Sequence, residues 1–246
     1  MADDTNDTDQ IEQDLAQTRA RMDRRLDQLG DRLAPNQLVN DALAHVTGGD
    51  GADFAQTLIA KAKANNMILV TPLAPGAGCT DGDGTCWYQP SSGLNPNQKA
   101  KWSADLVKDV FSKYDVHKDR FAFGGYSSGA QWTTQFFGPT HADALMVDGV
   151  GVALSYGGSP KSVDASANPV PINYSQEHKD NVVMVWDTGT SDSAYTTTGG
   201  WGVKAGKKWY DDNGFETQLH TWSGGHSRSD FGLVMDREIK EHVRPA

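Results

Sequence analysis

One serine of this chain lies in a motif that is typical of nucleophilic catalysis. Gly125-Tyr126-Ser127-Ser128-Gly129 has the form G-x-S-x-G, and it stands between the apolar run Phe121–Phe123 and a helix-forming stretch. The bare motif is weak, and the strand–turn–helix context is what gives it meaning. Glycines on both sides permit so sharp a turn. We predict that Ser127 is a nucleophile and that the Ser128 N–H faces the developing oxyanion.

A serine hydroxyl needs a base to become nucleophilic near neutral pH, and the base needs a group that orients it. After a nucleophile of this kind, the acid and then the histidine follow in chain order. His226 lies in the glycine-rich segment Ser223–Ser227, directly after an apolar strand pattern that ends at Trp222. We therefore predict that His226 is the general base.

Three aspartates are candidates for the acid, and we favour Asp192. It lies in the segment Asp187–Asp192, which follows a predicted strand and is long enough to approach a histidine from behind. Asp187 is the alternative, because it stands at the end of that strand. Asp148, on the preceding predicted strand, is a more distant third candidate.

The elements that would position these residues alternate between helix and strand. Apolar periodicity predicts helices over 52–65, 98–115, 128–137, 203–213 and 229–242 and strands over 67–71, 121–123, 144–152, 181–186 and 217–222. Such alternation indicates βαβ units. The predicted fold is α/β, a mostly parallel sheet with helices on both faces.

The first 45 residues have a different character. Apolar residues recur at steps of three and four over 10–33, which predicts an amphipathic helix with a narrow apolar seam, and a second short helix is plausible over 35–44. A seam so narrow must pack on the main domain, on a second copy or on nothing. Ile11–Leu15, Thr18-Arg19 and Ala34-Pro35 resemble a short helical family of unknown function from bacterial envelope-associated proteins. We divide the chain into a helical appendage, 1–45, and a main domain, 46–246.

The overall composition narrows the classes of partner. The formal net charge is -10, which disfavours nucleic acid, and no run of apolar residues is long enough to span a membrane. The acidic N-terminus does not read as a signal peptide.

Cys79 and Cys86 flank a short Gly/Asp loop that a disulfide would close, which would suit an exported protein. Localisation is therefore left open, and no metal site is predicted, since two cysteines need further ligands.

Several segments together resemble one group of enzymes over residues 45–246. GGYSSGA, GTSD and GGHS, with GGDGADF, MILVTPLAPG and the two cysteines beside CWYQ, are similar to α/β-hydrolases of the polyhydroxybutyrate depolymerase-like and feruloyl-esterase-like group. The resemblance implies hydrolysis of carboxylic esters through an acyl-enzyme formed by Ser127, His226 and Asp192. It also implies no metal and no organic cofactor.

The chain departs from that group at its front end. His45-Val46-Thr47-Gly48-Gly49-Asp50-Gly51 looks like the oxyanion loop H-G-T-G-G-D-G, with Val46 in the place of the first glycine. We expect the Thr47 N–H to be the second oxyanion donor and the valine to disturb it. The β-rich run that should precede this loop is replaced by the helical segment, so early edge strands are expected to be missing.

Four aromatic residues in or near the loops are candidates for a substrate groove: Trp87, Tyr88, Trp132 and Trp201. For each of them, packing in the core or at a rim is the alternative.

Two functions from different classes follow. The first is a serine esterase that acts on a small or polymeric ester, polyhydroxyalkanoate and feruloyl esters being plausible. The second is a catalytically impaired hydrolase-fold scaffold that associates with itself or others through the N-terminal helix.

Overall fold

The computed structural model describes residues 42–48, 51–72, 87, 95–160, 172, 174–226 and 231–243, and for 42–48 and 51–56 it describes the backbone alone. The predicted N-terminal helix, the loop with Cys79 and Cys86, and Tyr88 lie outside the described residues. So do any strands before residue 42, whose absence was expected.

Six parallel strands of the described residues form one sheet, in the order β2-β1-β3-β4-β5-β6. The strands are β1 (Ala42–Gly48), β2 (Met67–Val70), β3 (Phe121–Tyr126), β4 (Gly149–Leu154), β5 (Val182–Gly189) and β6 (Glu216–Trp222). Because all six run in one direction, their carboxyl ends meet at a single edge. In open α/β sheets this is the edge at which ligands bind.

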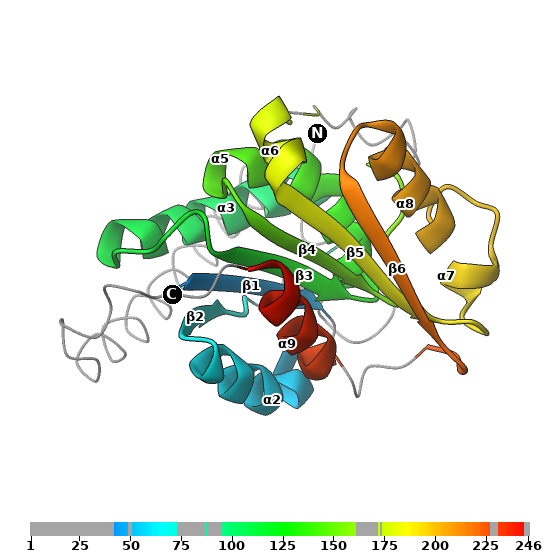
Figure 1. Ribbon diagram of the computed structural model, residues 1–246, viewed down its shortest axis with the longest axis horizontal. Helices are drawn as coiled ribbons and strands as arrows, with labels where there is room; N and C mark the ends of the chain where they lie inside the picture. Colours follow the sequence, from blue (N-terminus) through cyan, green and yellow to red (C-terminus); the bar gives the residue numbers. More distant parts are fainter. Residues whose placement is uncertain are drawn as a thin grey trace, which may run out of the picture.

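Helices cover both faces of the sheet (Figure 1). On one face lie α2 (Gly51–Ala64) and α9 (Phe231–His242), which pack against each other. The other face carries α3 (Pro96–Lys113), α6 (Gln176–Asn181), α8 (Val203–Asp212) and the continuous helical run formed by α4 (Ser128–Trp132), the π-helix η2 (Thr133–Ala142) and α5 (Asp143–Leu145). The short α7 (Ser193–Thr196) follows β5. This three-layer arrangement confirms the predicted fold class.

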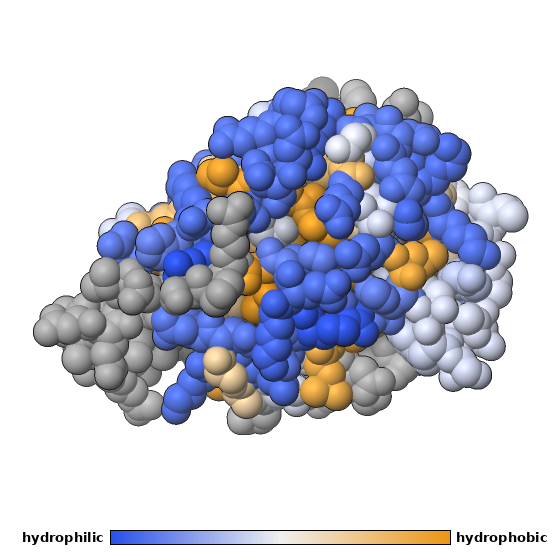
Figure 2. Space-filling view, viewed as in Figure 1, coloured by the Kyte–Doolittle hydropathy of each residue, from blue (hydrophilic) through white to orange (hydrophobic). Residues whose placement is uncertain are grey.

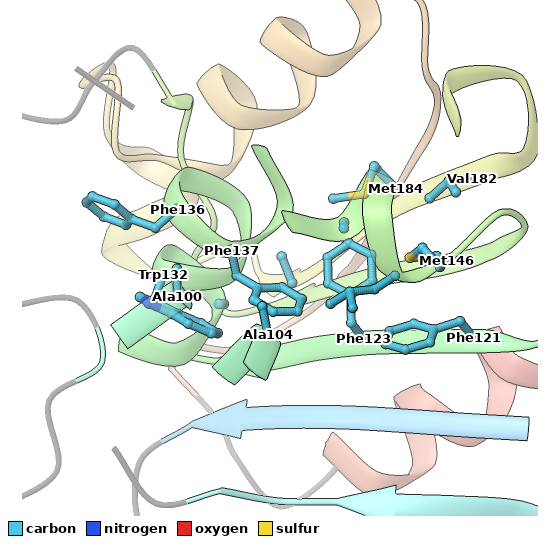
Figure 3. Close-up of a cluster of buried hydrophobic side chains, with 14 of the residues drawn as sticks. Ala100, Ala104, Phe121, Phe123, Trp132, Phe136, Phe137, Met146, Val182 and Met184 are labelled. Carbon is cyan, nitrogen blue, oxygen red and sulfur yellow. The ribbon is translucent and has the colours of Figure 1, made fainter. Parts of the chain in front are cut away.

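A hydrophobic core lies on each face of the sheet. The larger one joins β3 and β5 to α3 and η2, with Phe123, Trp132, Phe137 and Met184 among the side chains seen in Figure 3. The smaller one packs Leu58 of α2 and residues of α9 against the opposite face. Buried strands of a parallel sheet read as continuous apolar runs because both of their faces are covered.

Two predicted segments belong to another kind of element than expected. Residues 144–148 are not strand, since Asp143–Leu145 ends a helix and β4 begins only at Gly149, where φ is 148° and an added Cβ would lie 1.9 Å from the Phe121 carbonyl oxygen. A side chain there would collide with β3, so glycine is needed at the start of β4.

The second correction concerns the front of the domain. Ala42–Ala44 are strand rather than the end of a short helix, and the segment from His45 to Gly48 continues that strand rather than forming a loop. Among the described residues, the sheet therefore includes Ala42–Gly48, and the division of the chain at 45/46 stays a prediction. Pairing with β2 and β3 determines the conformation of this segment, which local periodicity does not reveal.

The outer surface is mostly hydrophilic on the face shown in Figure 2, with isolated apolar areas. Among the described residues, no helix has the length and apolar character to cross a membrane.

Candidate active site

Ser127 occupies the sharp turn between β3 and α4. Its backbone has φ 53° and ψ -120°, a conformation that a residue with a side chain rarely adopts. The Ser127 N–H donates to the Leu154 carbonyl at 3.0 Å, which ties the turn to the end of β4. An added Cβ at Gly125 would lie 2.3 Å from the Gly129 carbonyl carbon, so this close crossing of strand and helix requires glycine. The strain is thus held in place by its surroundings.

His226 lies directly against the serine. Its Nε2 is 3.0 Å from Ser127 Oγ, and its Nδ1 is 2.8 Å from Asp192 Oδ2. An ionised carboxylate can only accept hydrogen bonds, so the proton of a neutral His226 belongs on Nδ1. Nε2 then presents a lone pair to the serine hydroxyl, as a general base must.

Asp192 is held from two sides. Its side chain is 1% exposed, and Oδ1 accepts a hydrogen bond from the Ala194 N–H at 2.9 Å, which makes Asp192 the N-cap of α7. Oδ2 remains free to accept from His226. The capping bond fixes the carboxylate before any substrate arrives, because a short polar side chain at a helix start satisfies an otherwise unpaired N–H.

The loops that carry Asp192 and His226 pack backbone to backbone. The Thr190 N–H donates to the Trp222 carbonyl at 2.9 Å, and the Ser191 N–H donates to the Gly224 carbonyl at 2.8 Å. A Cβ on Gly189 would lie 2.3 Å from the Gly224 carbonyl oxygen. Gly189 therefore permits the approach that brings the aspartate to the histidine.

The other two aspartate candidates lie elsewhere. The Asp187 carboxylate is paired with Arg237 at 2.5 Å and is buried. Burial alone would lower the pKa of Arg237, but its hydrogen bonds to Asp187 and Glu238 outweigh burial and raise it. Asp148 precedes β4 at the opposite edge of the sheet, where its carbonyl accepts from Phe121.

Two backbone N–H groups were predicted to face the oxyanion. Ser128 is the first residue of α4, so its N–H has no acceptor within the helix. Thr47 lies in β1 beside Gly125, two residues before the serine, in a part of the strand that extends beyond its pairing with β2. Ser128 and Thr47 therefore both lie at the edge of the sheet where Ser127 lies. Their roles as oxyanion donors remain predictions.

The aromatic candidates separate into two groups. Trp132 is fully buried and donates from Nε1 to the Pro96 carbonyl, and Trp87, 1% exposed, packs against it with ring centroids 4.6 Å apart. Both belong to the larger core, so the alternative given for them, packing in the core rather than in a substrate groove, is the correct one. Trp201 is half-buried and stacks on Tyr156 at 5.4 Å.

Tyr156 was missed by sequence reasoning. Its ring meets that of His226 edge-on at 5.4 Å, and Tyr126 contacts the same imidazole at 5.0 Å. The missed signal was the position of Tyr156, two residues beyond the end of β4 and so at the carboxyl edge of the sheet. Its loop is fixed, since the Gly157 carbonyl accepts from Trp186 Nε1 at 2.6 Å and the Ser159 carbonyl accepts from Gln135.

Solved structures share this fold. Arabidopsis thaliana SOBER1 is 17% identical, with a TM-score of 0.54 over 82% of this chain and 98% of that one. Zea mays acyl-protein thioesterase 2 is 18% identical, with a TM-score of 0.54 over 82% and 93% of the two chains. A ferulic acid esterase is 16% identical, with a TM-score of 0.53 over 82% and 84%. The described domain thus has an α/β-hydrolase fold.

The N-terminal segment matches a different family. A family described as a protein of unknown function (DUF3618) matches residues 5–49. This agrees with the resemblance seen in the first 45 residues and carries no chemistry. The search of curated proteins finds no match.

Proposed function

We propose that this protein is a serine hydrolase that cleaves carboxylic esters through an acyl-enzyme. The observation that carries the proposal is the unbroken contact from Asp192 through His226 to Ser127, with distances of 2.8 and 3.0 Å. A buried carboxylate, an imidazole and a hydroxyl in this order form the apparatus that activates a serine. In this proposal no metal or organic cofactor takes part.

Acylation begins when Ser127 Oγ attacks the ester carbonyl carbon. The hydroxyl proton passes to His226 Nε2, and Asp192 stabilises the resulting imidazolium. The Ser128 N–H, with Thr47 as second donor, stabilises the negative oxygen of the tetrahedral intermediate. The bond from the carbonyl carbon to the alcohol oxygen then breaks, and the alcohol leaves with the proton from His226.

Deacylation repeats these steps with water. His226 takes a proton from a water molecule, whose oxygen attacks the acyl carbon. The bond to Ser127 Oγ breaks, and the proton returns to the serine. The acid product leaves and the free enzyme is restored.

The surroundings of His226 support an apolar or planar acyl group in the substrate. Tyr156 contacts the imidazole and also stacks on Trp201, and aromatic rings so close to the base favour such a group. Polyhydroxyalkanoate- and feruloyl-type esters fit this description. One structural neighbour is a ferulic acid esterase and another is an acyl-protein thioesterase, which supports acyl transfer as the common chemistry.

A second candidate is a hydrolase-fold scaffold without turnover, which binds partners or a second copy through the N-terminal helical segment. The altered front end favours it, because Val46 and Thr47 lie within β1, where the resembling enzymes have an oxyanion loop with a glycine in the place of Val46. Loss of one oxyanion donor costs about a hundred- to a thousand-fold in kcat.

Covalent labelling by a fluorophosphonate probe separates the two candidates. An activated Ser127 attacks the phosphorus and expels fluoride, so the full-length chain should be labelled once, at Ser127. Hydrolysis of p-nitrophenyl acetate by the same preparation tests turnover. We expect Ser127→Ala to remove labelling and to lower kcat by about 10⁶-fold.

Ser191→Ala is the matched control, since Ser191 lies in the neighbouring loop and no role is assigned to its hydroxyl. Folded protein that takes up no probe would favour the scaffold. Activity that survives in Ser127→Ala would contradict the assignment of the nucleophile.

A further inference from the structure

The last turn of α9 carries three side chains that can bind a metal. Glu238, Glu241 and His242 are spaced i, i+3 and i+4, which places them on one face of the helix. One ligand atom from each lies within 4.8 Å of the others. None of the three takes part in the proposed ester hydrolysis.

Two of these atoms are buried and have no hydrogen-bond partner among the residues that the structure describes. The Glu238 side chain is 0% exposed and that of His242 is 9% exposed, and neither Glu238 Oε2 nor His242 Nε2 forms a hydrogen bond within the described residues. The other carboxylate oxygen of Glu238 is bound by Arg237. A buried polar atom without a partner costs about 1–3 kcal/mol. The two atoms face each other, so one group placed between them would satisfy both.

The spacing of these atoms is that of ligands rather than of a hydrogen bond. His242 Nε2 is 3.4 Å from Glu238 Oε2 and 3.8 Å from Glu241 Oε1. With metal–nitrogen and metal–oxygen bonds of about 2.1 Å, 3.4 Å subtends about 110° at the ion, which is the tetrahedral angle. The longer separation subtends about 130°. Glu241 is 52% exposed and is free to rotate toward the tetrahedral position.

The local charge favours a divalent cation. The Arg237 guanidinium is shared by Asp187 and Glu238, so two carboxylates beside one arginine leave one negative charge in excess, and Glu241 adds another. The site also lies at the carboxyl end of α9, where the helix dipole favours positive charge. Over α9, the face shown in Figure 2 is mainly hydrophilic.

We propose that Glu238, Glu241 and His242 bind one divalent transition-metal ion, with water completing the coordination. One imidazole and two carboxylates form a donor set that zinc accepts. The exposed Glu241 provides the route by which the ion reaches the two buried ligands. The ion would neutralise the buried Glu238 and fix the end of α9, which makes the site structural.

Zinc binding to the full-length chain tests the proposal. After dialysis against a chelator, the protein is titrated with ZnCl₂ by calorimetry, and the melting temperature is recorded with and without zinc. We expect one ion per chain at this site and a higher melting temperature in its presence, because an ion that binds only the folded state stabilises it.

Glu241→Gln and His242→Gln should each weaken zinc binding by at least ten- to a hundred-fold, the loss usual even for residues that only support a ligand. The matched controls are Glu177→Gln on α6 and His117→Gln, whose imidazole is exposed beside Asp119. Both controls should bind as the original chain does. Glu241 is half exposed, so its substitution leaves the fold intact, and circular dichroism checks this.

Three results would overturn the proposal. The first is the absence of zinc binding by folded protein. The second is binding that is unchanged in both Glu241→Gln and His242→Gln, which would indicate an adventitious ion only. The third is binding that is lost in Cys79→Ser/Cys86→Ser while both α9 variants keep it, which would assign the ion to the cysteines.

Discussion

Two histidines of this protein stand beside carboxylates in different ways. His226 is 39% exposed, and both of its ring nitrogens lie within hydrogen-bond distance of a partner, at 2.8 and 3.0 Å. His242 is 9% exposed, and its Nε2 stands 3.4 and 3.8 Å from two carboxylates. The first spacing suits proton transfer between Ser127 and His226 with Asp192 holding the imidazole, and the second leaves room for an ion.

The difference follows from the elements that carry the groups. Asp192, His226 and Ser127 come from three separate segments at one edge of the sheet. The packing of these segments against one another therefore determines the distances between their side chains, which allows direct hydrogen bonds. Glu238, Glu241 and His242 come from the last turn of one helix. Side chains four residues apart on a helix can touch directly, as Asp236 and Lys240 do at 2.8 Å, whereas the 3.4 and 3.8 Å spacings at His242 Nε2 leave room for an ion.

Among the variants that test this comparison, the largest effect should come from Asp192→Asn. Asparagine can still accept the Ala194 N–H and cap α7, but it lacks the charge that orients and stabilises the His226 imidazolium. We expect kcat for p-nitrophenyl acetate to fall by about 10⁴-fold, while zinc affinity at α9 stays the same. Steady-state kinetics and zinc titration of the variant check both halves.

Asp187→Asn is the comparison for that variant. It removes the charge that pairs with Arg237 rather than with His226, so its main effect should be on stability, of about 1–3 kcal/mol, because Arg237 keeps Glu238 as a partner. A loss of activity in folded Asp187→Asn as large as in Asp192→Asn would return Asp187 to the role of the acid.

Gly189→Ala should have an intermediate effect. The new methyl group would lie 2.3 Å from the Gly224 carbonyl oxygen, so the histidine loop must move away from the aspartate loop. A displacement of about 1 Å in a catalytic group costs about a hundred-fold in rate. We expect kcat to fall by this amount, with little change in the fold by circular dichroism.

Gly225→Ala is the matched control, because a Cβ at this neighbouring glycine meets nothing within 4 Å. It should keep most of the activity. Equal losses in the two variants would show that flexibility of the glycine-rich loop, rather than close packing at Gly189, determines the position of His226.

The smallest effect concerns a third histidine, His178, which is 2% exposed and stacks on Tyr174. Burial lowers the pKa of His178, and the Asp143 carboxylate and the Met146 carbonyl oppose this only in part. As the pH falls, a histidine whose pKa is lowered by folding takes up a proton more readily in the unfolded protein than in the folded one. Its contribution to stability is therefore full above about pH 6.5 and is lost as the pH falls below that value.

Urea unfolding at pH 7.5 and pH 5 measures this contribution. His178→Gln should lose less stability between the two pH values than the original chain does, and the exposed His117→Gln should behave as the original. An unchanged pH dependence in His178→Gln would assign the acid sensitivity to other groups.

The main predictions from sequence succeeded where local signals were strong. Alternating apolar runs predicted the α/β class, and the strand–turn–helix motif predicted the turn at Ser127. The start of β4 and the strand nature of Ala42–Gly48 were not predicted, because contact with neighbouring strands decides both. Charged residues surround His178 and His242 in sequence, which does not predict burial, yet His178 is 2% exposed and the His242 side chain is 9% exposed.

The sequence by itself determined the order of the helices and strands and the types of residue that stand at the carboxyl edge of the sheet. A parallel sheet necessarily brings the carboxyl ends of its strands together, so the residues after β3, β5 and β6 were bound to be neighbours. Only the tertiary structure decided that His226 pairs with Asp192 rather than Asp187, since Arg237 of α9 occupies Asp187. It also decided that Glu238 and His242 are buried, because burial depends on what packs over a helix face, which spacing along the chain does not reveal.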